Sequence, residues 1–143
     1  MSTAARLSAY LDNIDGSQPF SWRTNNCSHL AAGWWLAATG IKALQGLDMP
    51  CGPTTAPRWL ARHGGNFADL VARQLKRPRI APQLAQAGDL VIVADGLCSA
   101  GGVGGALGVC TGRLAVLLGA DGRLVRGPMS SALHAYPLDE ARA

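Results

Sequence analysis

The feature that most constrains the fold of this chain is a change of pattern near residue 80. Before it, apolar residues recur three or four positions apart, as they do on the buried face of a helix. After it, short runs of valine, leucine and isoleucine alternate with glycine-containing turns, which is typical of strands. Helices followed by antiparallel strands predict an α+β fold, and 143 residues suit one domain, which we expect to span residues 1–143.

Four helices are expected before the change of pattern. One lies within residues 1–18, and the others form a helical part at residues 19–80. The predicted helices cover residues 3–14, residues 27–39, a segment through Trp59 and Leu60 that ends at His63, and residues 66–76.

The second predicted helix carries the most informative residues. Asn25 or Asn26 can cap its first turn, and Cys27 opens it. Trp34 falls on the same face as Cys27 and is expected in the core. Trp35 lies on another side of this helix, where it either forms a second packing face or anchors an interface with another protein.

Residues 86–138 predict a small antiparallel sheet on which the helices pack. The predicted strands lie within residues 88–95, 106–112, 113–119, 123–129 and 133–138. A hairpin turn is indicated at Asp121-Gly122. The glycine-rich residues 99–105 are followed by a strand, whereas a phosphate-binding loop requires a helix there, so we expect no phosphate site.

The composition excludes several classes of protein. Hydrophobic residues make up 48% of the chain and charged residues 15%, which argues against disorder. Basic residues cluster only at residues 73–79, with no aromatic residue among them, so nucleic-acid binding is not expected. No apolar run reaches the length of a membrane span, and the first residues do not form a secretory signal, so we expect no membrane span.

The four cysteines form no CxxC pair. They are Cys27, Cys51, Cys98 and Cys110. Four cysteines allow three pairings, and the sequence leaves the disulfide state of the last three open, with free thiols as the default. Cys27 and His29 lack further metal ligands at a usual spacing, so we expect no metal and no cofactor.

Five motifs between residues 19 and 138 carry a resemblance to a known family. They are, in order, "PFSWRTNNCSHLAAGWW", "ARHGG", "AGDLVIVAD", "ALGVCTG" and "GADGRLVRGPM". In this order they resemble the NlpC-type peptidases of the papain-like cysteine peptidase superfamily, most closely a branch found in tail modules of phages and prophages. The resemblance implies a papain-like fold, in which a cysteine opens a helix that packs on a small antiparallel sheet. It places the nucleophile at Cys27, where the helix N-terminus lowers the pKa of a thiol.

The resemblance also implies a base and an orienting residue, and here the sequence departs from the family. The family's base histidine corresponds to Ala106, which cannot accept a proton. The orienting polar residue belongs on the next strand, yet residues 113–119 are apolar between their ends. His134 is the alternative base, because His29 points away from Cys27 on a helix and His63 fits a helix-end role. Cys27 is therefore predicted as a buried core residue and the domain as a degenerate peptidase.

The expected function follows from this resemblance. It implies a structural component of a tailed-phage tail tip or baseplate, present in the virion and assembled in the host cytoplasm. Its partners would be other tail proteins, reached through residues 49–57 and 99–105. The alternative is an active cysteine peptidase or amidase that degrades peptidoglycan during genome delivery, and a third class is a free-standing cytoplasmic inhibitor or binding module.

Overall fold

The structure is a computed structural model that describes residues 2–17, 27–44, 56–94, 105–119 and 121–142. The described α-helices are α1 (Thr3–Ile14), α2 (Cys27–Thr39), α3 (Ala56–Arg62) and α4 (Phe67–Leu75). The strands are β1 (Leu90–Val93), β2 (Ala106–Cys110), β3 (Leu114–Leu118), β4 (Leu124–Pro128) and β5 (Ala132–Tyr136). Three short 3-10 helices are η1 (Pro82–Leu84), η2 (Met129–Ser131) and η3 (Glu140–Arg142). The α+β fold predicted from the sequence is confirmed.

The helix ends follow local sequence signals. The Asn66 side chain accepts a hydrogen bond from Asp69 N at 3.0 Å and so caps the start of α4. Lys76, which we expected inside this helix, ends it in the left-handed conformation with φ of 54°. Two sets of predicted residues cannot be followed in the structure. The candidate caps Asn25 and Asn26 lie outside the described residues, as do most of the candidate contact loops at residues 49–57 and 99–105.

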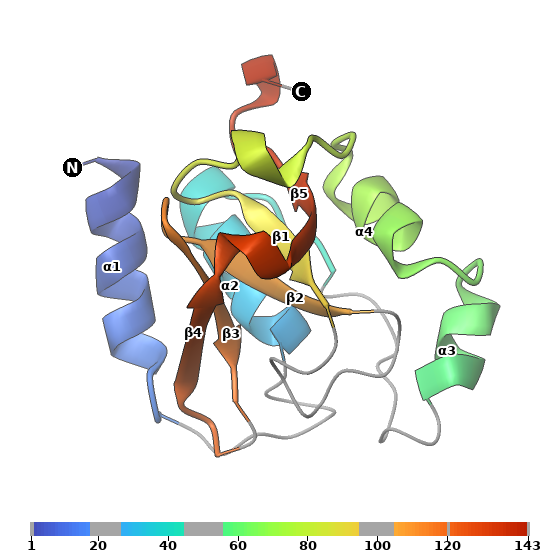
Figure 1. Ribbon diagram of the computed structural model, residues 1–143, viewed down its shortest axis with the longest axis horizontal. Coiled ribbons are helices and arrows are strands. Elements are labelled where there is room, and N and C mark those ends of the chain that lie inside the picture. The colour runs from blue at the N-terminus through green and yellow to red at the C-terminus, as the bar shows by residue number, and fades with distance from the viewer. Residues whose placement is uncertain (1, 18–26, 45–55, 95–104, 120, 143) are drawn as a thin grey trace.

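The five strands form one antiparallel sheet in the order β4-β3-β2-β1-β5. The two edge strands are consecutive in the chain and are joined only by the three residues of η2. Four neighbouring spacings separate the edges of a flat sheet by about 19 Å. The link from Pro128 to Ala132 can span at most about 14 Å. The sheet must therefore curl, and Figure 1 shows η2 crossing in front of the other strands.

Both edges of the curled sheet are partly covered. Asp15, just after α1, accepts a hydrogen bond from Leu124 N on β4 at 2.9 Å. On the other edge, Ile80 and Ala135 of β5 exchange backbone hydrogen bonds of 2.9 and 3.3 Å. Such covering limits pairing with the strands of another molecule.

Helix α2 is buried on more than one side because it lies between α1 and the sheet. The Trp34 indole Nε1–H donates to Gly88 O at 2.8 Å, which joins the helix to the turn before β1. The Tyr10 hydroxyl of α1 donates to Leu30 O at 2.8 Å. Trp34 is in the core, as predicted, and Trp35 is also only 1% exposed, under the Arg77 guanidinium at 5.6 Å. Of the two alternatives for Trp35, internal packing is therefore correct.

We predict that Gly33→Ala destabilises the protein, although alanine favours a helix interior by about 1 kcal/mol relative to glycine. A Cβ at Gly33 would collide with the Tyr10 hydroxyl oxygen. Moving Tyr10 would strain the packing and lose its bond to Leu30, for a net cost of about 1–3 kcal/mol. Urea unfolding would measure this loss.

The matched control is the same substitution in a Tyr10→Phe background. Without the hydroxyl, the nearest ring atoms lie at 3.4 and 3.6 Å from the added carbon, which is close to ordinary contact. Gly33→Ala should then cost much less. An equal cost in both backgrounds would rule out the Tyr10 hydroxyl as the reason for glycine at this position.

Candidate functional site

Cys27 is the first residue of α2, and α2 packs on β2 and β3. This is the placement that the sequence predicts, with the cysteine in the first turn of a helix that lies on the sheet. The partial positive charge of the helix N-terminus is therefore present at this residue. The side chain of Cys27 is not among the parts of the chain that the structure describes.

Ala106 is the first residue of β2, where the resemblance expects a base. It is 4% exposed and pairs with Val93 of β1. The neighbouring strand β3 is apolar throughout, and its residues Ala115 to Leu118 are buried. The positions of the family's base and of its orienting residue thus hold only apolar side chains.

His134 lies on β5, and the pairing register places it on the other face of the sheet from Ala106. It pairs with Ile92, which pairs in turn with Leu107, and residues paired directly across strands share a face. Ala106 is the neighbour of Leu107, and neighbours along a strand project to opposite faces. A base at His134 would therefore not occupy the family's base position.

Two charged side chains, Asp69 of α4 and Arg79 after it, act on His134. Asp69 and Arg79 form an ion pair of 3.1 Å on the protein surface. Burial, followed by the positive charge of Arg79, lowers the pKa of His134, while Asp69 acts in the opposite direction. The His134 imidazole is therefore less readily protonated than a free imidazole, and the charges that act on it belong to Arg79 and Asp69.

The other two histidines have separate surroundings. His29 lies in the first turn of α2, and burial lowers the pKa of its imidazole. His63 follows α3, and its ring lies 4.9 Å from the ring of Trp59 between centroids. The His63 carbonyl accepts a hydrogen bond of 2.8 Å from Arg73, which joins the end of α3 to α4. This agrees with the helix-end role that the sequence indicates for His63.

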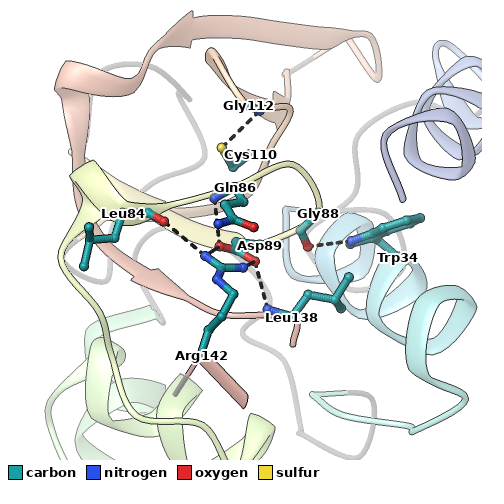
Figure 2. Close-up of polar contacts among 9 residues, drawn as sticks. All are labelled: Trp34, Leu84, Gln86, Gly88, Asp89, Cys110, Gly112, Leu138 and Arg142. Atoms are coloured by element: carbon teal, nitrogen blue, oxygen red, sulfur yellow. Dashed lines mark hydrogen bonds and ion pairs between the residues drawn. The ribbon is translucent and has the colours of Figure 1, made fainter. Parts of the chain in front are cut away.

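The most polar buried group among the described residues is Asp89, directly before β1 (Figure 2). Its carboxylate is 0% exposed and accepts four hydrogen bonds. The backbone N–H groups of Gln86 and Leu138 donate at 2.9 Å each. The guanidinium of Arg142 donates at 3.0 and 2.7 Å, one bond to each carboxylate oxygen.

Arg142 completes this cluster from the last described turn of the chain. Its guanidinium also donates to Leu84 O at 3.0 Å, so it contacts η1 and Asp89 together. Hydrogen bonding to Asp89 raises the pKa of Arg142, and burial opposes this. The pair is charged and bidentate, and it holds residues 84–89 against residues 138–142. We call the Asp89–Arg142 pair the clasp, because it links two segments of the chain. Both carboxylate oxygens of Asp89 already accept hydrogen bonds from these segments.

Cys110 lies beside this cluster at the end of β2 (Figure 2). Its sulfur accepts a hydrogen bond from Gly112 N at 3.2 Å. Burial, and then the nearby Asp89 carboxylate, raise the pKa of the thiol, while the Gly112 bond and Arg142 act in the opposite direction. A buried thiol that stays protonated is a poor nucleophile. Cys110 is a free thiol, as expected, whereas Cys51 and Cys98 lie outside the described residues.

The Asp89–Arg142 pair was not predicted from the sequence. The sequence does contain one indication of a buried pair: Asp89 stands directly before four apolar strand residues. An aspartate in such a position is expected to be buried, and a buried aspartate almost always has a partner. The identity of the partner, 53 residues away, has no local signal.

The described residues contain no group of three or more His, Cys, Asp and Glu side chains that could hold a metal ion. No helix in that part of the chain is long and apolar enough to cross a membrane.

The structure is an α+β domain in which Cys27 opens a helix on an antiparallel sheet and Ala106 begins a strand that this helix contacts. A family model described as a domain of unknown function (DUF6950) matches residues 2–138. The match covers nearly the whole chain, and the chain therefore belongs to the DUF6950 family. A search of curated proteins gives no match.

We predict that Arg142→Met lowers the free energy of unfolding by about 3–5 kcal/mol, because Asp89 stays buried without its charged partner. Urea unfolding followed by circular dichroism would measure the change. Arg126→Met, at an exposed position on β4, is the matched control and should leave the midpoint nearly unchanged.

A second variant separates the charge from the packing of the side chain. Adding Asp89→Asn to Arg142→Met removes the unpaired charge and should recover part of the lost stability. Equal stability of Arg142→Met and the wild type would show that the clasp contributes nothing.

The pH dependence of stability should follow His29 and His134, whose pKa values in the folded protein are both lowered from 6.5. Below that value the unfolded chain binds more protons, so their contribution is present above about pH 6.5 and is lost as the pH falls. Urea unfolding at pH 7.5, 6.5 and 5.5 should show decreasing stability. The double variant His29→Gln/His134→Gln should have a smaller slope, and an unchanged slope would contradict the assignment.

Proposed function

We propose that this domain is a degenerate, papain-like NlpC-type domain that acts as a structural component of a tail tip or baseplate in a tailed phage or prophage. The observation that carries the non-catalytic part is Ala106, a buried alanine at the start of the strand where an active enzyme needs its base. The assignment to a phage tail rests on the order of the five sequence motifs.

The arrangement of the elements supports the papain-like part of the proposal. Helix α2 begins at Cys27 and packs on β2, the strand that Ala106 begins. Figure 1 shows α2 behind the sheet, and β2 and β3 are the strands that it contacts. A helix that opens with cysteine and packs on a small antiparallel sheet is what the NlpC-type resemblance implies.

The chemistry of peptide cleavage supports the absence of catalysis. The thiolate attacks, but the amine leaving group must also be protonated, and a general acid–base group contributes typically about 10²–10⁴-fold in rate. Alanine supplies no proton, and the apolar β3 cannot orient a substitute. His134 is on the opposite face of the sheet from Ala106 and lies near Asp69 and Arg79. Burial raises the pKa of the Cys110 thiol, which makes it a poor nucleophile.

The alternative function is an active cysteine peptidase or amidase acting on peptidoglycan. One observation favours it: α2 begins at Cys27, and the N-terminus of a helix can lower the pKa of a thiol without a neighbouring base. This alternative requires a histidine at the start of α2 from another source, such as a partner subunit.

Incubation of the purified protein with peptidoglycan should release no peptide, and Cys27→Ser should behave like the wild type. Liquid chromatography with mass spectrometry detects the products, and a known wall-degrading enzyme serves as positive control. In phage particles that carry Cys27→Ser, the protein should be retained and infectivity should stay nearly unchanged.

Two results would contradict the proposal in different ways. Release of peptides by the wild type but not by Cys27→Ser would establish the peptidase. Absence of the wild-type protein from purified particles would exclude a structural role in the tail.

A further inference from the structure

The positive charge of this protein is concentrated in one segment. Residues 56–85 contain six Lys and Arg and one acidic residue, a net charge of +5, while the whole chain carries +4. The rest of the chain is therefore close to neutral. The segment contains α3, α4 and the residues up to η1.

Both helices turn their basic side chains away from the core. On α3, Arg58 and Arg62 are four residues apart and exposed, whereas Trp59 between them is 2% exposed. On α4, the buried residues are Phe67, Ala68, Leu70, Val71 and Leu75. Arg73 and the terminal Lys76 are exposed.

Two polar contacts join these side chains into one surface. Arg73 donates to the His63 carbonyl at 2.8 Å, which places the outer side of α4 next to the end of α3. Arg79 returns to the first turn of α4 through its ion pair with Asp69 at 3.1 Å. We call the resulting surface the basic face; it consists of Arg58, Arg62, Arg73, Lys76 and Arg79. Figure 1 shows α3 and α4 together on the side of the molecule away from α1.

The chemistry of the basic face favours carboxylates over nucleic acid. Its nearest aromatic residues, Trp59 and Phe67, are buried and offer no ring for base stacking. The face also contains the Asp69 carboxylate, paired with Arg79 at 3.1 Å, so it carries both signs of charge, as protein interfaces do. Arginine, which supplies four of the five cations, binds carboxylates through two parallel hydrogen bonds. A mixed surface of this kind complements an acidic protein surface.

We propose that the basic face docks an acidic surface of a neighbouring protein subunit. The choice of a tail subunit as the partner rests on the proposed function, whereas the preference for carboxylates rests on the face itself. The polar contacts of Arg73 and Arg79 hold part of the face in place before binding, which leaves Arg58, Arg62 and Lys76 as the side chains that the partner engages.

The first experiment uses the purified full chain and poly-L-glutamate as the probe. The face variant is Arg58→Glu/Arg62→Glu/Lys76→Glu. The control, Arg113→Glu/Arg123→Glu/Arg126→Glu, changes the net charge equally at exposed positions near β3 and β4. We expect the face variant to lose about tenfold or more in affinity at low salt and the control to stay within about twofold. Equal loss in both variants, or no binding by the wild type, would overturn the proposal.

A second arm tests nucleic acid with a duplex DNA of the same total charge. Tighter binding of the DNA than of poly-L-glutamate by the wild type would overturn the preference for carboxylates. Unfolding midpoints of both variants equal to that of the wild type exclude a loss of fold as the cause of weaker binding.

The third arm uses phage particles. The face variant should be depleted from purified particles while the control variant is retained, and equal retention would overturn the docking role. If the wild type itself is absent from particles, the proposed function fails, while the poly-L-glutamate arm still decides whether the basic face binds carboxylates.

Discussion

A single buried carboxylate holds the two ends of the sheet region together. Asp89 has no exposure to solvent, and a charge in that position is costly unless every oxygen is satisfied. Two backbone N–H groups and the guanidinium of Arg142 satisfy it. The turn before β1, the short helix η1 and the residues after β5 therefore keep one relative arrangement, and α2 joins it through the bond from Trp34 to Gly88.

Asp89 and Ala106 differ in how strongly the packing of the fold depends on their side chains. Asp89 is fully engaged by hydrogen bonds inside the protein, so replacing its partner disturbs the packing of several elements. Ala106 pairs through its backbone with Val93, and its side chain only fills space. The sheet register and the packing of α2 therefore depend less on the side chain at the start of β2 than on the pairing of Asp89.

The order and type of the elements could be predicted because their signals are local. Periodicity and a capping asparagine were enough for α1, α2 and the start of α4, and apolar runs between turns were enough for the five strands. The partner of Asp89, the burial of Trp35 and the reason for Gly33 depend on residues distant in sequence. At the candidate site, the helix start at Cys27 and the alanine at β2 were predictable, whereas the face on which His134 lies required the strand register.

The pairing of β5, the last strand of the chain, with β1, the first, also has a consequence for the order of folding. Strands β1 to β4 are neighbours in sequence and can pair as each is synthesised, but β5 must return to the open edge of β1. Until residues 132–136 are synthesised, β1 is an edge strand. Asp89 also remains without its partner Arg142, which is 53 residues further along the chain. Sequence-distant contacts of this kind form slowly. A chain that ends before β5 thus leaves the apolar strand β1 with an unpaired edge and Asp89 without its charged partner, and an unpaired apolar edge promotes aggregation.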